Sequence, residues 1–206
     1  ENKELDDIET SFLRSIIHGS DKVPLLKFTR AAFLTSQLYN IAKNALFLHV
    51  IREPRSWVSA HLTCSNKNHK ILKNSKLFFN KDNGFNWWSM ESIANDFVRA
   101  NNYSLWKKPG YYKLLYIWHS FNKKIQEDGE MLFKDNYVKV PLENFITDYK
   151  YTVQIVGEFI ESKNINSVCS FAKKVLVKSK SIPFEDHSYW NSAFREIGID
   201  EMGSLK

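Results

Sequence analysis

The sequence LFLHVIREPRSWVSAHL, residues 46–62, decides the fold class that this chain is expected to have. Its first part, Leu46 to Ile51, is a short apolar run typical of a strand buried on both faces inside a parallel sheet. Pro54 follows shortly after, and proline is favoured in the first turn of a helix because its missing N–H would have no partner there. The segment therefore predicts a buried strand that leads through a tight turn into a short helix over residues 55–62.

The turn of this segment carries a cation. Arg52 follows the strand, and the carboxyl end of a strand in an open α/β sheet is where ligands bind. Helix N-terminal N–H groups and a guanidinium fork both suit phosphate oxygens. Arg55 adds a second cation, and Ser59 offers a hydroxyl on roughly the same side. We predict that Arg52, Arg55 and Ser59 bind an anion; the alternative is an ion pair between Arg52 and a carboxylate such as Glu53.

Four segments resemble the sulfotransferase family, whose members use 3'-phosphoadenosine 5'-phosphosulfate. The sequence Arg-Glu-Pro-Arg at residues 52–55, followed by a helix that carries Ser59, looks like the family's 3'-phosphate-binding segment. VPLLKFTRAAF resembles the strand before it in bacterial members, WHSFN a late helix, and YVKVPLENFITD a late strand with its turn. These three runs are residues 23–33, 118–122 and 137–148, so the resemblance covers most of residues 22–160.

The resemblance implies an α/β fold with a mostly parallel sheet flanked by helices, in the P-loop-kinase-like sulfotransferase architecture. It implies an enzyme that transfers a sulfuryl group from 3'-phosphoadenosine 5'-phosphosulfate to a hydroxyl or amine acceptor, releases 3',5'-diphosphoadenosine and uses no metal. Arg52, Arg55 and Ser59 would then hold the 3'-phosphate of the donor. We expect one domain over residues 1–206, with a loop insertion over the polar, lysine-rich residues 67–86.

Two further cations are candidate catalytic residues. Lys27 and Arg30 follow a strand predicted over residues 23–28, and the carboxyl ends of neighbouring parallel strands meet at one edge of a sheet. There they would contact sulfate or acceptor oxygens and stabilise the charge that develops during transfer. The alternative is that Lys27 and Arg30 are an ordinary pair of surface cations.

Two features depart from the family pattern. The family's basic, Gly- and Ser/Thr-containing phosphosulfate loop, which cradles phosphates as a P-loop does, has no counterpart in residues 1–22, and we expect the chain to begin after that loop. The usual serine is one residue further from the first arginine, where Ala60 stands; either the turn is one residue shorter or the hydroxyl is lost. A degenerate, non-catalytic nucleotide- or anion-binding module of the same fold is therefore the alternative function.

Composition limits the remaining possibilities. The 206 residues are 43% hydrophobic, which suits one domain with a core of ordinary size, and no apolar run approaches the roughly 20 residues that cross a bilayer. Cys64 and Cys169 fit no metal spacing and favour a reducing compartment, so we expect a cytoplasmic location. The net charge of +6 suits an anionic nucleotide. A nucleic-acid partner is not expected, because the aromatic residues follow helical periodicity instead of alternating with cations on an exposed face.

Hydrophobic periodicity predicts which residues are buried and where the remaining strand and helices lie. His49 is expected to be a core histidine and Trp118 a core residue. Asn122 would either contact the cofactor or cap a turn, and Glu143 would order a local turn. Besides the strands and helix already named, we expect a strand over residues 137–140 and helices over residues 5–18, 31–43, 87–103, 112–125 and 152–161.

Overall fold

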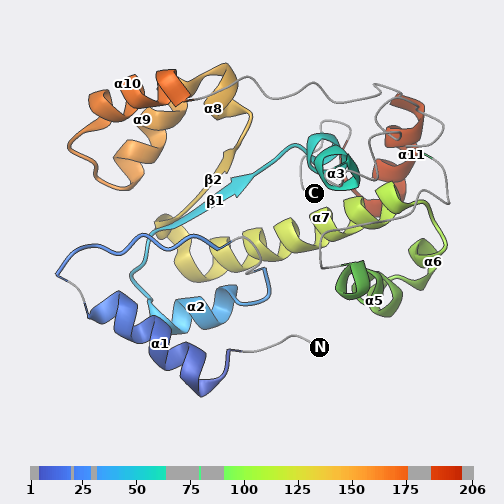
Figure 1. Ribbon diagram of the computed structural model, residues 1–206, viewed down its shortest axis with the longest axis horizontal. Coiled ribbons are helices and arrows are strands. Elements are labelled where there is room, and N and C mark those ends of the chain that lie inside the picture. The colour runs from blue at the N-terminus through green and yellow to red at the C-terminus, as the bar shows by residue number, and fades with distance from the viewer. Residues whose placement is uncertain are drawn as a thin grey trace. The chain divides into compact units, whose positions relative to one another are not determined.

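The computed structural model describes residues 5–19, 21–28, 32–63, 79, 91–175 and 187–200. Most of these residues are helical, and two strands form one parallel sheet (Figure 1), so the chain is α/β in the broad sense. The elements are α1 Asp7–His18, α2 Thr35–Ile41, β1 Phe47–Ile51, α3 Pro54–Thr63, α5 Glu91–Asn101, α6 Tyr103–Trp106, α7 Gly110–Asp128, a π-helix Gly129–Phe133, a 3-10 turn Lys134–Asn136, β2 Tyr137–Pro141, α8 Asn144–Thr147, α9 Tyr149–Phe159, α10 Ile165–Val175 and α11 His187–Ile197.

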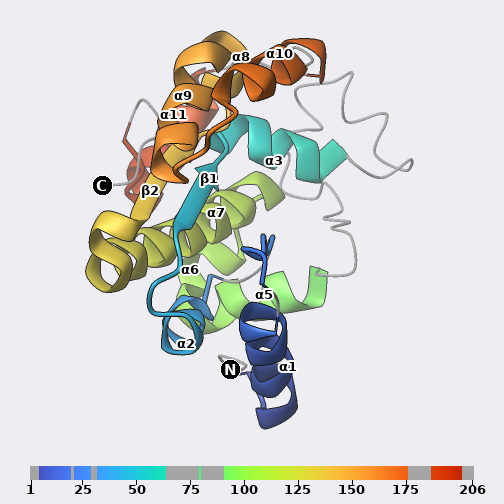
Figure 2. The ribbon, with the colours of Figure 1, turned by 90° about the vertical axis from the view of Figure 1, so that its left-hand side faces the viewer.

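The two strands lie where the sequence predicts them. They run side by side in the same direction, with Phe47 opposite Tyr137 and Ile51 opposite Pro141 (Figures 1 and 2). Parallel strands need a long crossover connection, and the chain supplies one through α3 to α7. The expectation of parallel pairing is confirmed for this pair of strands.

The prediction that β1 is buried on both faces is wrong. Leu48 and Val50 are 37% and 46% exposed, whereas His49 on the opposite face is 5% exposed. Val140, which lies beside Val50 in the register, is only 4% exposed. The apolar run of β1 predicts a strand correctly, but the covering of its second face depends on elements far along the chain, which the run itself cannot specify.

The strand predicted over residues 23–28 is also absent. This segment has no regular secondary structure, and Val23 and Leu25 are each 97% exposed. A strand is stabilised by a ladder partner and by apolar cover rather than by its own composition, and Pro24 removes one of the N–H donors that a ladder needs. The apolar pattern alone was therefore misleading here.

The residues pack into two units, each with its own core. The first comprises residues 1–51 and 121–177, and the second comprises residues 52–120 and 178–206. In the first unit, the Phe47 ring packs on Phe133, with their centroids 4.9 Å apart. In the second unit, Trp118 and Trp190 are 2% and 1% exposed, which confirms that Trp118 is a core residue.

Several helix boundaries differ from the predicted ones. The helix predicted over residues 87–103 is instead α5 followed by α6, and the side chain of Asn102 caps α6 by accepting a hydrogen bond from the Leu105 N–H. Helical structure continues past α7 as a π-helix that begins at Gly129. A Cβ on Gly129 would lie 2.3 Å from the Tyr137 ring, so the close approach of that ring requires glycine.

The remaining differences concern α10, α11 and the predicted loop. α10 and α11 form in segments for which we predicted no helix. The loop predicted over residues 67–86 lies outside the described residues except for Phe79, which stacks on Tyr189 with 4.5 Å between the ring centroids. None of the helices in the described ranges is both long enough and apolar enough to cross a bilayer.

Candidate anion-binding site

The strand–turn–helix segment around Arg52 forms as the sequence predicts. β1 ends at Ile51, two residues make the turn, and α3 begins at Pro54, which is buried. The indole Nε1–H of Trp118 donates a hydrogen bond to the backbone oxygen of Arg52 at 2.9 Å. The backbone at Arg52 is therefore anchored by a buried residue, while its side chain is half-exposed.

Glu53 caps the N-terminus of α3. One oxygen of its carboxylate accepts a hydrogen bond from the backbone N–H of Ser56 at 2.7 Å, and the other pairs with Nε of Arg55 at 2.5 Å. A carboxylate at this position satisfies a helix N–H that has no intrahelical partner and interacts favourably with the helix dipole. Nε of Arg55 is therefore bonded to Glu53 in the same turn. The two terminal nitrogens of Arg55 do not take part in this ion pair.

Arg52 differs from Arg55 in this respect. Within the part of the chain that the structure describes, the Arg52 guanidinium forms no ion pair with a carboxylate. The alternative in which Glu53 neutralises Arg52 is therefore not what the structure has, because Glu53 pairs with Arg55 instead. A half-exposed guanidinium at the end of a strand, without an acidic partner among the described residues, is suited to bind an anion.

Ser59 lies on the inner face of α3. It is 3% exposed, and Ser56, one turn earlier, is 7% exposed, whereas Val58 is completely buried. Arg52, Arg55 and Ser59 all belong to the second unit. That the three side chains hold one phosphate between them stays a prediction.

The candidate catalytic cations are placed less favourably. Lys27 is exposed in a segment without regular structure, so it does not lie at the end of a strand. Arg30 lies outside the described residues. The geometric premise for grouping Lys27 with Arg30 at a sheet edge is therefore not met, and their roles in transfer stay predictions.

His49 belongs to a separate buried polar network that the sequence reveals only in part. Its Nδ1 lies 2.9 Å from the Tyr137 hydroxyl, and its Nε2 lies 3.0 Å from Oδ1 of Asn122. Burial is the main cause that lowers the pKa of His49, and burial also raises the pKa of Tyr137 above its ordinary value. His49 is 5% exposed and both of its ring nitrogens are hydrogen-bonded, so it is a core histidine, as predicted, and Asn122 contacts it.

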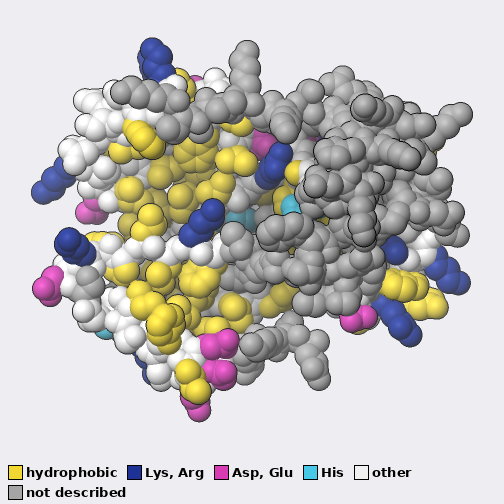
Figure 3. Space-filling model, viewed as in Figure 1, with side chains coloured by type: hydrophobic (Ala, Val, Ile, Leu, Met, Phe, Trp, Pro, Cys, Tyr) yellow, Lys and Arg dark blue, Asp and Glu magenta, His cyan; other side chains and the backbone are white. Residues whose placement is uncertain are grey.

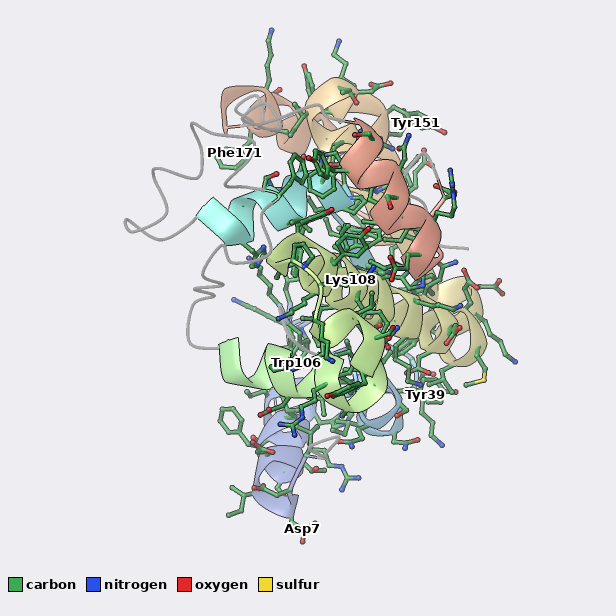
Figure 4. All side chains as sticks on the ribbon, turned by 90° about the vertical axis from the view of Figure 1, so that its right-hand side faces the viewer. Asp7, Tyr39, Trp106, Lys108, Tyr151 and Phe171 are labelled. Carbon is green, nitrogen blue, oxygen red and sulfur yellow. The ribbon has the colours of Figure 1, made fainter. Side chains whose placement is uncertain are left out.

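Lysines cover aromatic rings between α6 and the start of α7, a feature that sequence reasoning missed. Trp106 and Lys108 are labelled in this region in Figure 4. Tyr103 is 60% exposed, although we expected buried aromatics. Each ammonium group occupies a ring face on which a nucleic-acid base would otherwise stack. The pairs are Lys107 over Tyr103 at 5.9 Å, Lys108 over Tyr112 at 5.1 Å and Lys113 over Trp106 at 4.6 Å, each measured to the ring centroid.

Other features of the described residues do not add to the site. A shallow hollow of about 470 Å³ lies along α11, and none of the residues lining it is a predicted site residue. Its Glu196 pairs with Lys108 at 3.0 Å, a hydrogen bond that raises the pKa of Lys108. Among the described residues, no three His, Cys, Asp or Glu side chains gather where they could hold a metal ion.

Comparison with known proteins gives no relative for this chain. No family model, no curated protein and no solved structure matches it. The function of this chain is therefore inferred from the residues of the Arg52 segment and from the resemblance of their sequence.

Proposed function

We propose that this protein is a sulfotransferase of P-loop-kinase-like architecture that binds 3'-phosphoadenosine 5'-phosphosulfate through its 3'-phosphate. The observation that carries the proposal is the position of Arg52. It follows a strand that is paired in parallel, precedes a helix that begins at Pro54, and has no acidic partner among the described residues. The order of these elements agrees with the sequence resemblance at residues 52–55.

Each site residue has a distinct part in this proposal. The Arg52 fork donates to two oxygens of the 3'-phosphate. Arg55 adds its terminal nitrogens, since its Nε is already bonded to Glu53, and Ser59 adds a hydroxyl. The acceptor hydroxyl or amine attacks sulfur in line, the bond from sulfur to the bridging phosphate oxygen breaks, 3',5'-diphosphoadenosine leaves, and the acceptor proton passes to a base. Positioning and charge stabilisation, to which Lys27 and Arg30 would contribute, lower the barrier.

A non-catalytic nucleotide-binding module is the second candidate. Residues 7–18 form helix α1, and neither strand among the described residues leads into a following helix through a glycine-containing turn. Such a turn provides the backbone cradle that a 5'-phosphosulfate requires. The described residues therefore support 3'-phosphate binding better than they support sulfuryl transfer.

Isothermal titration calorimetry with 3',5'-diphosphoadenosine tests the binding proposal. Arg52→Ala should weaken binding about 10- to 100-fold, since a charge-assisted hydrogen bond contributes about 1.5–3 kcal/mol. Arg99→Ala, which removes an exposed arginine of α5 in the same unit, is the matched control and should change nothing. Adenosine 5'-monophosphate, which lacks the 3'-phosphate, should bind equally weakly to the wild type and to Arg52→Ala. Equal affinity of wild type and Arg52→Ala for the bisphosphate would refute the site.

Product release separates the enzyme from the binding module. The protein is incubated with 3'-phosphoadenosine 5'-phosphosulfate and a panel of hydroxyl and amine acceptors, and 3',5'-diphosphoadenosine is quantified. A sulfotransferase releases it faster with an acceptor than without one. Arg52-dependent binding without acceptor-stimulated release supports the module.

A further inference from the structure

The backbone oxygen of Arg52 lies between two sets of backbone hydrogen bonds. On the strand side, the oxygen of Ile51 accepts a bond from the Leu142 N–H at 2.7 Å. On the helix side, the oxygen of Glu53 accepts a bond from the Trp57 N–H at 2.9 Å. Backbone oxygens inside a protein need a donor. For Arg52, which follows the strand and precedes the helix, that donor is a side chain.

Trp118 of α7 supplies this donor. Many large hydrophobic side chains reach the surface of the protein (Figure 3), whereas Trp118 is 2% exposed. A buried indole N–H costs free energy unless it has an acceptor, so buried tryptophans usually have one. The 2.9 Å bond from Nε1 of Trp118 to the Arg52 oxygen satisfies both groups. It also joins the core to a residue 66 positions away in the sequence.

The residues that follow Arg52 are held as well. The Glu53 carboxylate accepts a hydrogen bond from the Ser56 N–H at 2.7 Å. Pro54 is buried, and its ring fixes its backbone φ. The backbone is thus held at Arg52 and after it, while the guanidinium is carried by a half-exposed side chain. A donor whose backbone is already ordered loses less conformational freedom on binding, and this preorganisation strengthens binding.

We propose that Trp118 is a positioning residue for Arg52, and that its indole N–H holds the Arg52 backbone where the guanidinium can meet a 3'-phosphate. This assignment rests on the proposed function of Arg52. Trp118 acts through the backbone and does not touch the ligand itself. Without the N–H, the Arg52 oxygen would have to find water and the turn before α3 would become mobile. Ordering that turn would then weaken the binding of the anion.

Two matched phenylalanine variants test the proposal. Trp118→Phe keeps an aromatic ring in the core and removes the N–H, and Trp190→Phe makes the same change at a 1% exposed tryptophan of the same unit. By calorimetry, Trp118→Phe should bind 3',5'-diphosphoadenosine about 3- to 10-fold more weakly than the wild type, as expected for residues in one network. Trp190→Phe should bind it like the wild type. Adenosine 5'-monophosphate, which offers Arg52 no 3'-phosphate, should bind all three proteins equally.

A double-mutant cycle shows whether the effect passes through Arg52. In an Arg52→Ala background, Trp118→Phe should change the affinity for 3',5'-diphosphoadenosine by less than about twofold, because no guanidinium is left to position. A general loss of stability would not depend on residue 52 in this way. An equal loss in both backgrounds, or no loss in the wild-type background, would overturn the proposal.

A measurement without ligand separates this proposal from the proposed function. Backbone nitrogen-15 order parameters of Arg52 and Glu53 should be about 0.85 in the wild type, as in rigid backbone, and should fall toward about 0.6 in Trp118→Phe but not in Trp190→Phe. Unchanged values would overturn the proposal, even when the nucleotide binds. A fall in a protein that does not bind 3',5'-diphosphoadenosine would support the positioning of Arg52 and refute the 3'-phosphate site.

Circular dichroism establishes that each variant is folded. Should Trp118→Phe fail to fold, 3-benzothienylalanine at position 118 takes its place in the same measurements. This analogue has a ring of the same shape in which sulfur replaces the N–H, so it removes the donor and keeps the packing. Wild-type affinity and wild-type order parameters with this analogue would overturn the proposal.

Discussion

His49 and Arg52 are three residues apart in the sequence and illustrate two different uses of a basic side chain. Both ring nitrogens of His49 are hydrogen-bonded inside the protein, to Tyr137 and to Asn122. The Arg52 guanidinium is half-exposed and lacks an acidic partner among the described residues, although its backbone is anchored by Trp118. A group whose hydrogen bonds are made within the protein contributes to stability, whereas a partly exposed cation without a carboxylate among the described residues is suited to bind a ligand.

The comparison predicts that removing the imidazole damages stability and not ligand binding. His49→Phe removes the hydrogen bonds that the part-buried Tyr137 and Asn122 side chains make to the imidazole, and should lower the free energy of unfolding by about 2–4 kcal/mol. Urea unfolding measures the loss, and His18→Phe, at the exposed end of α1, is the control that should lose little. A stability loss below that of the control would show that the network is not structural.

The close contact behind Tyr137 gives a somewhat smaller effect of the same kind. Gly129→Ala places a methyl group 2.3 Å from the Tyr137 ring, which must move and thereby strain its bond to His49. We expect the free energy of unfolding to fall by about 1–3 kcal/mol, as for other overpacked sites. Alanine normally stabilises a helix relative to glycine by roughly 1 kcal/mol, so an increase in the urea midpoint would contradict the contact.

The histidine network should also make stability depend on pH. Burial lowers the pKa of His49 below its ordinary value of 6.5. As the pH falls through 6.5, the unfolded chain binds a proton that the folded protein does not yet bind, so the free energy of unfolding falls, by up to about 1.4 kcal/mol per pH unit. Urea unfolding between pH 7.5 and about 5 measures this fall. His49→Gln should lose that contribution; a variant with the same pH dependence as the wild type would mean that His49 is not the group responsible.

Arg55 should give the smallest effect of the cations at the site. Its guanidinium is bonded to Glu53 through Nε and is partly exposed, and partly exposed ion pairs contribute about 0–1 kcal/mol. We expect Arg55→Ala to lower the free energy of unfolding by less than about 1 kcal/mol and to weaken 3',5'-diphosphoadenosine binding only a few-fold. A loss of binding equal to that of Arg52→Ala would show that the two arginines act as equivalent phosphate ligands.

Local patterns predicted the elements of the candidate site, but not their partners. An apolar run and a proline were enough to place β1 and α3, because both signals act within a few residues. Glu53 pairs with Arg55 and not with Arg52, and this pairing depends on side-chain geometry at the start of α3, which the sequence does not show. Tyr137 is 88 positions from His49, and nothing in either local sequence indicates that the two rings meet.

The same reasoning explains the two failures in the sheet. Residues 23–28 have the composition of a strand but no ladder partner, and β1 has the composition of a doubly buried strand but one open face. In both cases the pattern indicates what a segment can become, whereas pairing and burial depend on neighbours that are distant in sequence. The exposure of Leu48 and Val50 on one face of β1 could not be predicted from the apolar run itself.

Phosphorus-31 nuclear magnetic resonance of 3',5'-diphosphoadenosine tests the central claim most directly, because the 3'- and 5'-phosphates give separate signals. If Arg52 holds the 3'-phosphate, adding wild-type protein should shift or broaden the 3' signal, and Arg52→Ala should leave that signal close to its position in free nucleotide. A 3' signal that moves equally with the wild type and with Arg52→Ala, or that moves with neither, would contradict the account.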